Sequence, residues 1–240
     1  MGGEAAGAAP ARRQRGRRSS ADRIFVPIPR RGLACLVAGS ALLLALWLGP
    51  LVPLSAISFS AHMILHLSIV SLAAPLIALG IALSWPDRLP RLFGLGAAIG
   101  ASLFDMFVVW IWHAPVLHES AATTTAIFVL QQASFLAAGL FVWTSALSGV
   151  TRRERAIGSL TLIGTFLHMT MLGVLLGVTP RLLYSPSVCI GAFGVSGLED
   201  QWLGGVLMAT VGGLPYLVAA LILAGLALSE DAPDERASTP

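Results

Sequence analysis

The 240-residue sequence contains no lysine, only two cysteines and few charged residues of either sign. Charged side chains make up 11% of the residues and hydrophobic ones 56%, and the mean hydropathy is +0.82. A soluble domain cannot cover its surface with so little charge. The composition therefore predicts an integral membrane protein. The net charge of +3 comes from arginines that lie between apolar runs, which indicates membrane topology rather than nucleic-acid binding.

Several catalytic site classes are absent from the sequence. Cys35 and Cys189 form neither a CxxC motif nor a disulfide framework. The segment from His62 to His66 lacks the glutamate of an HExxH zinc-protease helix, and five histidines are too few for a membrane di-iron enzyme. There is also no Walker loop, dinucleotide fingerprint or GxSxG elbow. Because nothing argues for catalysis, the protein is predicted not to be an enzyme.

Six apolar runs are long enough to cross about 30 Å of hydrocarbon. They cover residues 33–51, 61–83, 92–112, 121–146, 156–179 and 204–228. Since unsatisfied backbone groups are costly in lipid, each run is predicted to be a helix. The expected fold class is an all-α integral membrane protein, a bundle of six transmembrane helices. Residues 182–198 are short and rich in Gly, Ser and Pro, so we predict an outer loop there rather than a seventh span.

The arginines predict the orientation of this bundle. Residues 1–31 hold eight of the fifteen arginines and no apolar periodicity, which is typical of a disordered basic arm. If this arm is cytoplasmic, six spans place every other arginine except Arg181 on the same side. We therefore expect an N-in, C-in topology. Its parts are a cytoplasmic arm (1–31), a six-span membrane domain (32–228) and an acidic cytoplasmic tail (229–240).

Histidines gather on the side predicted to face outward. His62 and His66 are four residues apart, so they share one face of the second predicted helix at about 6 Å of axial separation. His113 and His118 follow the third span on the same side, whereas the cytoplasmic helix ends hold no histidine. The spacing of the first pair is typical of metal ligands. The alternative is that both rings lie near the water interface and form ordinary hydrogen bonds.

Further polar and sulfur-bearing residues fall inside the predicted spans. Counting inward at about 1.5 Å per residue gives a common depth of about 6 to 11 Å for four of them: His66, Asp105, Met106 and Met208. A carboxylate within a span costs about 2.5 to 3.5 kcal/mol, so Asp105 needs a partner, for which His66 or a bound cation is expected. Otherwise Asp105 is protonated or hydrogen-bonded to a neighbouring helix. Imidazole, thioether and carboxylate together suit copper, especially Cu(I), although such methionines also serve as packing.

Short motifs follow one another along residues 55–220. They are the segment Phe59–His66, the element Trp112–Pro115, Tyr184, and Asp200-Gln201 followed by Gly204-Gly205 and Met208. In this order they resemble the multi-span CtaG family of bacterial cytochrome c oxidase assembly factors. The resemblance implies an assembly role for a haem-copper oxidase with copper delivery, association with cytochrome c oxidase subunits, and a location in the bacterial plasma (inner) membrane.

The resemblance, together with the depths and ligand types above, suggests roles for single residues. The expected copper site at the outer face comprises His62, His66, His113, Met106, Met208 and Asp105. The residues expected to orient ligands or to lie along a polar path are Asp200, Gln201, Gln132 and His168. Delivery by ligand exchange implies an exposed site of moderate affinity. The family's fourth span often carries a histidine where this chain has Gln131-Gln132, and a tryptophan where it has Ala209.

Two alternatives from other classes stay open. A transporter or channel would use His66, Asp105, Gln132 and His168 to line a path across the membrane. A haem protein would use two histidines on different helices as axial ligands, for which His66 and His168 are the available pair despite their different depths. Transport in proteoliposomes tests the first interpretation, and a Soret band in the visible absorption spectrum tests the second.

Overall fold

The structure, a computed structural model, describes residues 29–86 and 94–229. Six helices in these ranges are long and apolar enough to cross a membrane. They are Arg30–Leu48, Phe59–Ser84, Leu95–Trp112, Thr125–Leu147, Arg152–Val178 and Gly197–Ser229. The predicted six-span helical bundle is thus confirmed. The predicted arm and tail lie outside the described residues, except that Pro29 precedes the first helix, Arg30 and Arg31 begin it, and Ser229 ends the last one.

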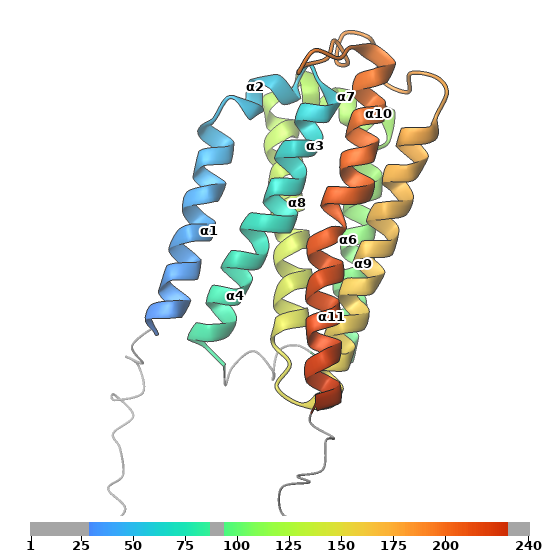
Figure 1. Ribbon diagram of the computed structural model, residues 1–240. Coiled ribbons are helices and arrows are strands. Elements are labelled where there is room, and N and C mark those ends of the chain that lie inside the picture. Colours follow the sequence, from blue (N-terminus) through green and yellow to red (C-terminus); the bar gives the residue numbers. More distant parts are fainter. Residues whose placement is uncertain (1–28, 87–93, 230–240) are drawn as a thin grey trace, which may run out of the picture.

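Two of the spans are interrupted by π-helical turns. The second span consists of α3 (Phe59–Ser68), a π turn (Ile69–Ala73) and α4 (Ala74–Ser84), and the sixth of α10 (Gly197–Leu207), a π turn (Met208–Gly212) and α11 (Leu214–Ser229). The uninterrupted spans are α1 (Arg30–Leu48), α6 (Leu95–Trp112), α8 (Thr125–Leu147) and α9 (Arg152–Val178), and the short helices are α2 (Leu51–Ser55) and α7 (Pro115–Thr123) (Figure 1).

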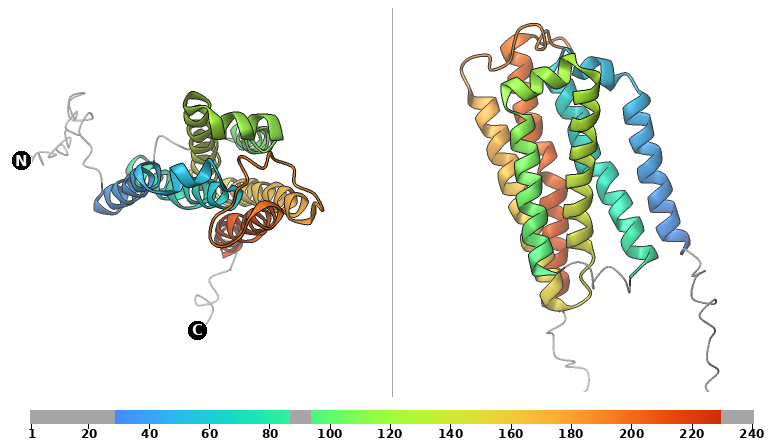
Figure 2. Two further views of the ribbon diagram at one scale, coloured as in Figure 1. Left: turned by 90° about the horizontal axis from the view of Figure 1, so that it is seen from above. Right: turned by 180° about the vertical axis from the view of Figure 1, so that it is seen from behind.

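The two ends of the bundle differ. α1 begins and α11 ends at the same end, at the bottom of Figure 1, which we call the terminal end. The helices α2 and α7 and the segment 179–196 lie at the opposite end, the α7 end, as both side views show (Figures 1 and 2). Arg30 and Arg31 begin α1 and Arg152 begins α9 at the terminal end, while Arg181 lies at the α7 end. That the α7 end faces outward remains the prediction made from these arginines.

The two π turns lie side by side in the middle of the bundle. A π turn shifts the hydrogen-bond register by one residue and so frees a carbonyl for another partner. The Val70 carbonyl accepts from Trp143 Nε1 at 2.9 Å and from the Tyr216 hydroxyl at 3.0 Å. The Ser71 hydroxyl donates to the Gly212 carbonyl of the other turn at 3.0 Å. Polar groups of three spans are thereby satisfied inside the bundle.

Glycines allow α9 and α10 to pack backbone against backbone. A Cβ on Gly205 would lie 2.4 Å from the Gly177 nitrogen, and one on Gly173 would lie 2.4 Å from the Ala209 nitrogen. Small residues four apart are the usual means of such close approach between membrane helices. This contact fixes the position of α10 and, through it, of Asp200 beside α3.

We expect Gly205→Ala to destabilise the protein by about 2 to 3 kcal/mol, because the added methyl group meets backbone that cannot turn aside. The measurement is the midpoint of thermal unfolding in detergent. Gly164→Ala is the matched control, since a Cβ there meets no atom within 4 Å. An equal midpoint for both variants would contradict the packing argument.

Candidate metal centre

Four histidines meet at the α7 end of the bundle. The distance between ring centroids is 4.7 Å for His62 and His118, 5.6 Å for His66 and His113, and 5.9 Å for His62 and His113. His62 and His66 lie on one face of α3, His113 follows the last residue of α6, and His118 lies on α7. All four side chains are buried. Three helices thus bring together the four histidines expected on the outer side.

The spacing of these rings suits a common metal ion. Imidazoles around one tetrahedral ion have centroids about 5 Å apart, given metal–nitrogen bonds of about 2.0 Å. Those three distances lie on both sides of this value, whereas the centroids of His62 and His66 are farther apart, at 6.3 Å. Nevertheless, no three His, Cys, Asp or Glu side chains in the described ranges are already arranged as ligands of one ion. The rings would therefore have to turn about their χ2 angles to direct their nitrogens at one point.

Each of the four rings has a buried nitrogen available to a ligand. Within the described ranges, no hydrogen-bond partner exists for His62 Nε2, His113 Nε2, His118 Nδ1 or either ring nitrogen of His66. Burying such groups without a partner is costly. His113 Nδ1 donates to the Val109 carbonyl at 2.6 Å, which leaves the lone pair of the neutral ring on Nε2. A hydrogen bond from the second nitrogen to a carbonyl is the usual support of a metal-binding histidine.

The first turn of α3 is held by an aspartate from another span. The buried Asp200 carboxylate of α10 accepts from the Phe59 nitrogen at 2.6 Å and the Ser60 nitrogen at 3.3 Å. It also accepts from the Ser58 hydroxyl at 2.9 Å and from the Ser60 hydroxyl. Such a carboxylate satisfies free N–H groups and complements the helix dipole. Asp200 therefore fixes the start of the helix that carries His62 and His66, without a hydrogen bond to either ring.

α7 explains why His118 joins the site. The sequence predicts a loop after the third span, and His118 was not among the expected ligands. Instead, Pro115 stands at the first position of a helix and Ala114 before it is extended, as a residue preceding proline usually is. The helix turns His118 inward, where it is 2% exposed. An Ala-Pro pair at this point is a helix-start signal, and His118 lies three residues after the proline.

The segment 179–196 covers the histidines from the α7 end. The Tyr184 ring lies 4.5 Å from the His118 ring and 4.8 Å from the Phe59 ring, and its hydroxyl donates to the His113 carbonyl at 3.0 Å. The Glu119 carboxylate of α7 accepts from the Ser185 nitrogen at 2.7 Å, which ties the segment down. Burial raises the pKa of Tyr184. The tyrosine is therefore a neutral cover for the cluster.

We expect the metal-free protein to lose stability as the pH falls below 6.5. Burial, together with the charge of His113, lowers the pKa of His118 from 6.5 to about 3. Between pH 6.5 and pH 3 the unfolded chain binds a proton on this histidine that the folded protein does not bind. The contribution of neutral His118 to the free energy of unfolding is therefore fully present above pH 6.5 and decreases as the pH falls toward 3. At pH 5 this amounts to about 2 kcal/mol. Thermal unfolding at pH 7.5 and 5.0 measures it, and His118→Gln should reduce the difference; an unchanged difference would contradict the assignment.

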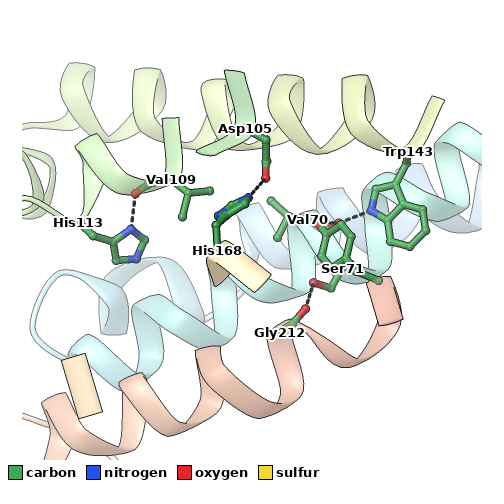
Figure 3. A network of polar contacts seen from close by, with 9 residues as sticks. Val70, Ser71, Asp105, Val109, His113, Trp143, His168 and Gly212 are labelled. Atoms are coloured by element: carbon green, nitrogen blue, oxygen red, sulfur yellow. Dashed lines mark hydrogen bonds and ion pairs between the residues drawn. The ribbon is translucent and has the colours of Figure 1, made fainter. Parts of the chain in front are cut away.

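Asp105 has a partner deeper in the bundle. His168 Nε2 lies 3.0 Å from Asp105 Oδ2, and both side chains are buried (Figure 3). The partner is His168 of the neighbouring helix α9 rather than the expected His66, which agrees with the alternative of a hydrogen bond between helices. Asp105 precedes His113 by eight residues on α6, which is about 12 Å of helix rise. The pair therefore lies outside the histidine cluster, in the layer of the π turns.

The Asp105–His168 pair predicts strongly non-additive stability changes. Asp105→Leu and His168→Leu should each cost about 3 to 5 kcal/mol, because each leaves a buried polar partner uncompensated. The double variant should recover most of that loss, since an apolar pair of similar size needs no partner. Thermal unfolding of the four proteins in detergent measures the coupling. Additive losses would show that the two side chains do not act as a pair.

The other expected site residues have surroundings of several kinds. Met106 is 39% exposed on the outside of the bundle, and Met208 is buried in the apolar core with Phe59 and Met63. Gln201 holds the start of the covering segment, accepting from the Leu183 nitrogen at 2.8 Å. Gln132 donates to Gln131 at 3.3 Å and lines a separate cavity. The residues expected along a transport path therefore lie in three places: His66 in the histidine cluster, Asp105 with His168 in the layer of the π turns, and Gln132 at the cavity. The two expected haem ligands, His66 and His168, lie in different ones of these.

The free cysteine near the site stays protonated. The Cys189 thiol lies 3.8 Å from Asp200 Oδ2, and burial, with the aspartate charge, raises its pKa to about 12. A thiol ligates metals as the thiolate. The protonated thiol is therefore not offered as a metal ligand, and the metal-ligating atoms at the site are the imidazole nitrogens that have no hydrogen bond in the described residues.

Comparison with known proteins gives one finding. The family described as cytochrome c oxidase caa3 assembly factor matches residues 6–229, which include every span. The match extends at both ends beyond the stretch of resembling motifs, residues 55–220. Neither curated proteins nor solved structures give a match to this chain. The chain belongs to the cytochrome c oxidase caa3 assembly factor family.

Proposed function

We propose that this assembly factor binds a copper ion at the four histidines and passes it to a haem-copper cytochrome c oxidase. The observation that carries the proposal is the cluster of four buried imidazoles whose free nitrogens have no hydrogen-bond partner in the described ranges. Imidazole is a good ligand for copper, and the family assembles an oxidase. The ligands we propose are His62, His66, His113 and His118.

The surroundings of the cluster favour a monovalent ion. Four neutral imidazoles bring no negative charge, and the cost of burying an ion rises with the square of its charge. The Asp200 carboxylate at the first turn of α3 and the Glu119 carboxylate of α7 are held by hydrogen bonds to backbone nitrogens, outside the four rings. A neutral ligand set without a coordinating carboxylate leaves less excess charge to bury around Cu(I) than around a divalent ion. We therefore propose Cu(I) as the cargo.

The burial of the site determines how the ion is exchanged. Delivery by ligand exchange led us to expect an exposed site, whereas the four rings are at most 4% exposed. In our proposal, Tyr184 and the segment around it move aside when the partner binds at the α7 end. This end faces outward in the plasma membrane if the arginine asymmetry gives the topology correctly. The oxidase subunit then supplies competing ligands.

The proposal is tested by loading and transfer of copper. Protein purified in detergent is incubated with Cu(I) under anaerobic, reducing conditions, and bound metal is measured after gel filtration. We expect one copper per chain, and recovery of activity when the loaded protein is mixed with copper-depleted oxidase. Absence of bound copper in the reduced protein would overturn the metal site. Bound copper without transfer would overturn delivery.

A further inference from the structure

A cavity lies on the side of the bundle between α1 and α8, apart from the histidines. Its volume is about 230 Å³, and its walls are Trp47 of α1 with Phe128, Val129, Gln132 and Ala133 of α8. Val129 is 58% exposed, so the cavity opens toward the surroundings of the bundle, which are lipid in a membrane.

Two polar atoms in the walls of this cavity have no partner. Trp47 Nε1 is a hydrogen-bond donor and Gln132 Oε1 is an acceptor, and both are buried without a hydrogen bond in the described part of the chain. Gln132 as a whole is 2% exposed. It follows the first residue of α8 by seven positions, or about 10 Å, so bulk water is distant. Leaving both groups unpaired at this depth is costly.

A hydroxyl group is both a donor and an acceptor, so one such group has the chemistry to pair with Gln132 Oε1 and with Trp47 Nε1. Phe128 and Val129 offer apolar surface to the body that carries it. We propose that this cavity binds an apolar membrane molecule with a single hydroxyl group. Isoprenoid alcohols and diacylglycerols both have this chemistry. A charged headgroup is excluded because the walls offer no ionised side chain.

The cavity is connected to the histidine cluster through two adjacent glutamines. Gln132 Nε2 donates to Gln131 Oε1 at 3.3 Å, and Gln131 is buried on the inner face of α8. One turn further along this face, the Phe135 ring lies 4.0 Å from the His66 ring. A ligand bound to Gln132 therefore acts on the same helix face that packs against the copper site we propose. The binding itself does not depend on copper.

The experiment is competitive photolabelling of the full chain in lipid nanodiscs. The probe is hexadecanol carrying a diazirine, and labelled peptides are identified by mass spectrometry. We expect labelling of residues 128–133. We also expect 1-decanol to compete about tenfold better than decane, the effect of one to two hydrogen bonds. Farnesol and dioctanoylglycerol are the further competitors, and whichever is stronger indicates the natural source. Equal competition by decanol and decane would overturn the proposal.

Two variants test the polar atoms separately from the apolar walls. Trp47→Phe removes the donor and keeps an aromatic ring, while Gln132→Leu removes the acceptor and keeps the size. Each should lower the preference for decanol over decane, because one of the two hydrogen bonds is lost, and leave labelling by the probe in place. Trp202→Phe is the matched control, because Trp202 Nε1 already donates to the Thr179 carbonyl on another side of the bundle. A lowered preference in this control, or an undiminished preference in both variants, would overturn the assignment.

Discussion

His66→Ala is expected to weaken Cu(I) binding by at least about 100-fold, because even residues behind a metal ligand usually contribute 10- to 100-fold. We choose His66 because neither of its ring nitrogens has a hydrogen-bond partner among the described residues, and because its ring lies near those of His113 and Phe135. In the double variant His62→Ala, His66→Ala, the bound copper should fall from one per chain to none. Competition with a chromophoric Cu(I) chelator under anaerobic conditions measures the affinity.

The control for this prediction is His168→Gln. Glutamine keeps a hydrogen-bonding side chain for Asp105, and His168 lies in the deeper layer of the bundle (Figure 3). This variant should bind copper as the parent does. If His168→Gln lost copper and His66→Ala kept it, the ion would lie at the Asp105 layer. That result would favour the transport interpretation, in which the polar residues inside the spans line a path.

Asp200→Ala is expected to destabilise the protein by about 3 to 5 kcal/mol. The substitution removes one carboxylate but leaves its donors behind, among them the Phe59 and Ser60 nitrogens and two serine hydroxyls. Buried groups that lose their partners account for a cost of this size. Because these donors begin α3, the variant should also disorder the helix that carries His62 and His66. Thermal unfolding in detergent and hydrogen exchange of the α3 amides measure the two effects.

Glu199→Ala is the matched control for Asp200. The two acids are adjacent in the first turn of α10, but Glu199 is exposed whereas Asp200 is fully buried. The control should change stability by less than about 0.5 kcal/mol. Similar unfolding midpoints for the two variants would show that Asp200 does not hold α3. Asp200→Asn should lie between them, since an amide oxygen accepts fewer and weaker hydrogen bonds than a carboxylate.

The sequence alone determined the spans and their chemical class. Lipid leaves the backbone no partner outside its own helix, so an apolar run of sufficient length predicts a helix without knowledge of its neighbours. The starts of α6 and α9 lie within four residues of the starts of the predicted runs. The helix α1 begins three residues before its predicted run, because Arg30 and Arg31 form its first turn together with the apolar residues. The ordered motifs likewise indicated the family that the comparison shows. Both properties are local, or depend only on order along the chain.

The tertiary structure alone decided which polar groups meet. Residue counting gives a depth for each side chain but not the rotation of its helix, so Asp105 was assigned to His66 and proved to contact His168. A loop prediction gives no direction at all, and His118 entered the cluster only because α7 turns it inward. Asp200 reaches α3 because α10 approaches α3 closely at Gly204, where a Cβ would lie 2.4 Å from the Phe59 ring. Contacts between spans depend on helix rotation and packing, which a pattern along one helix does not contain.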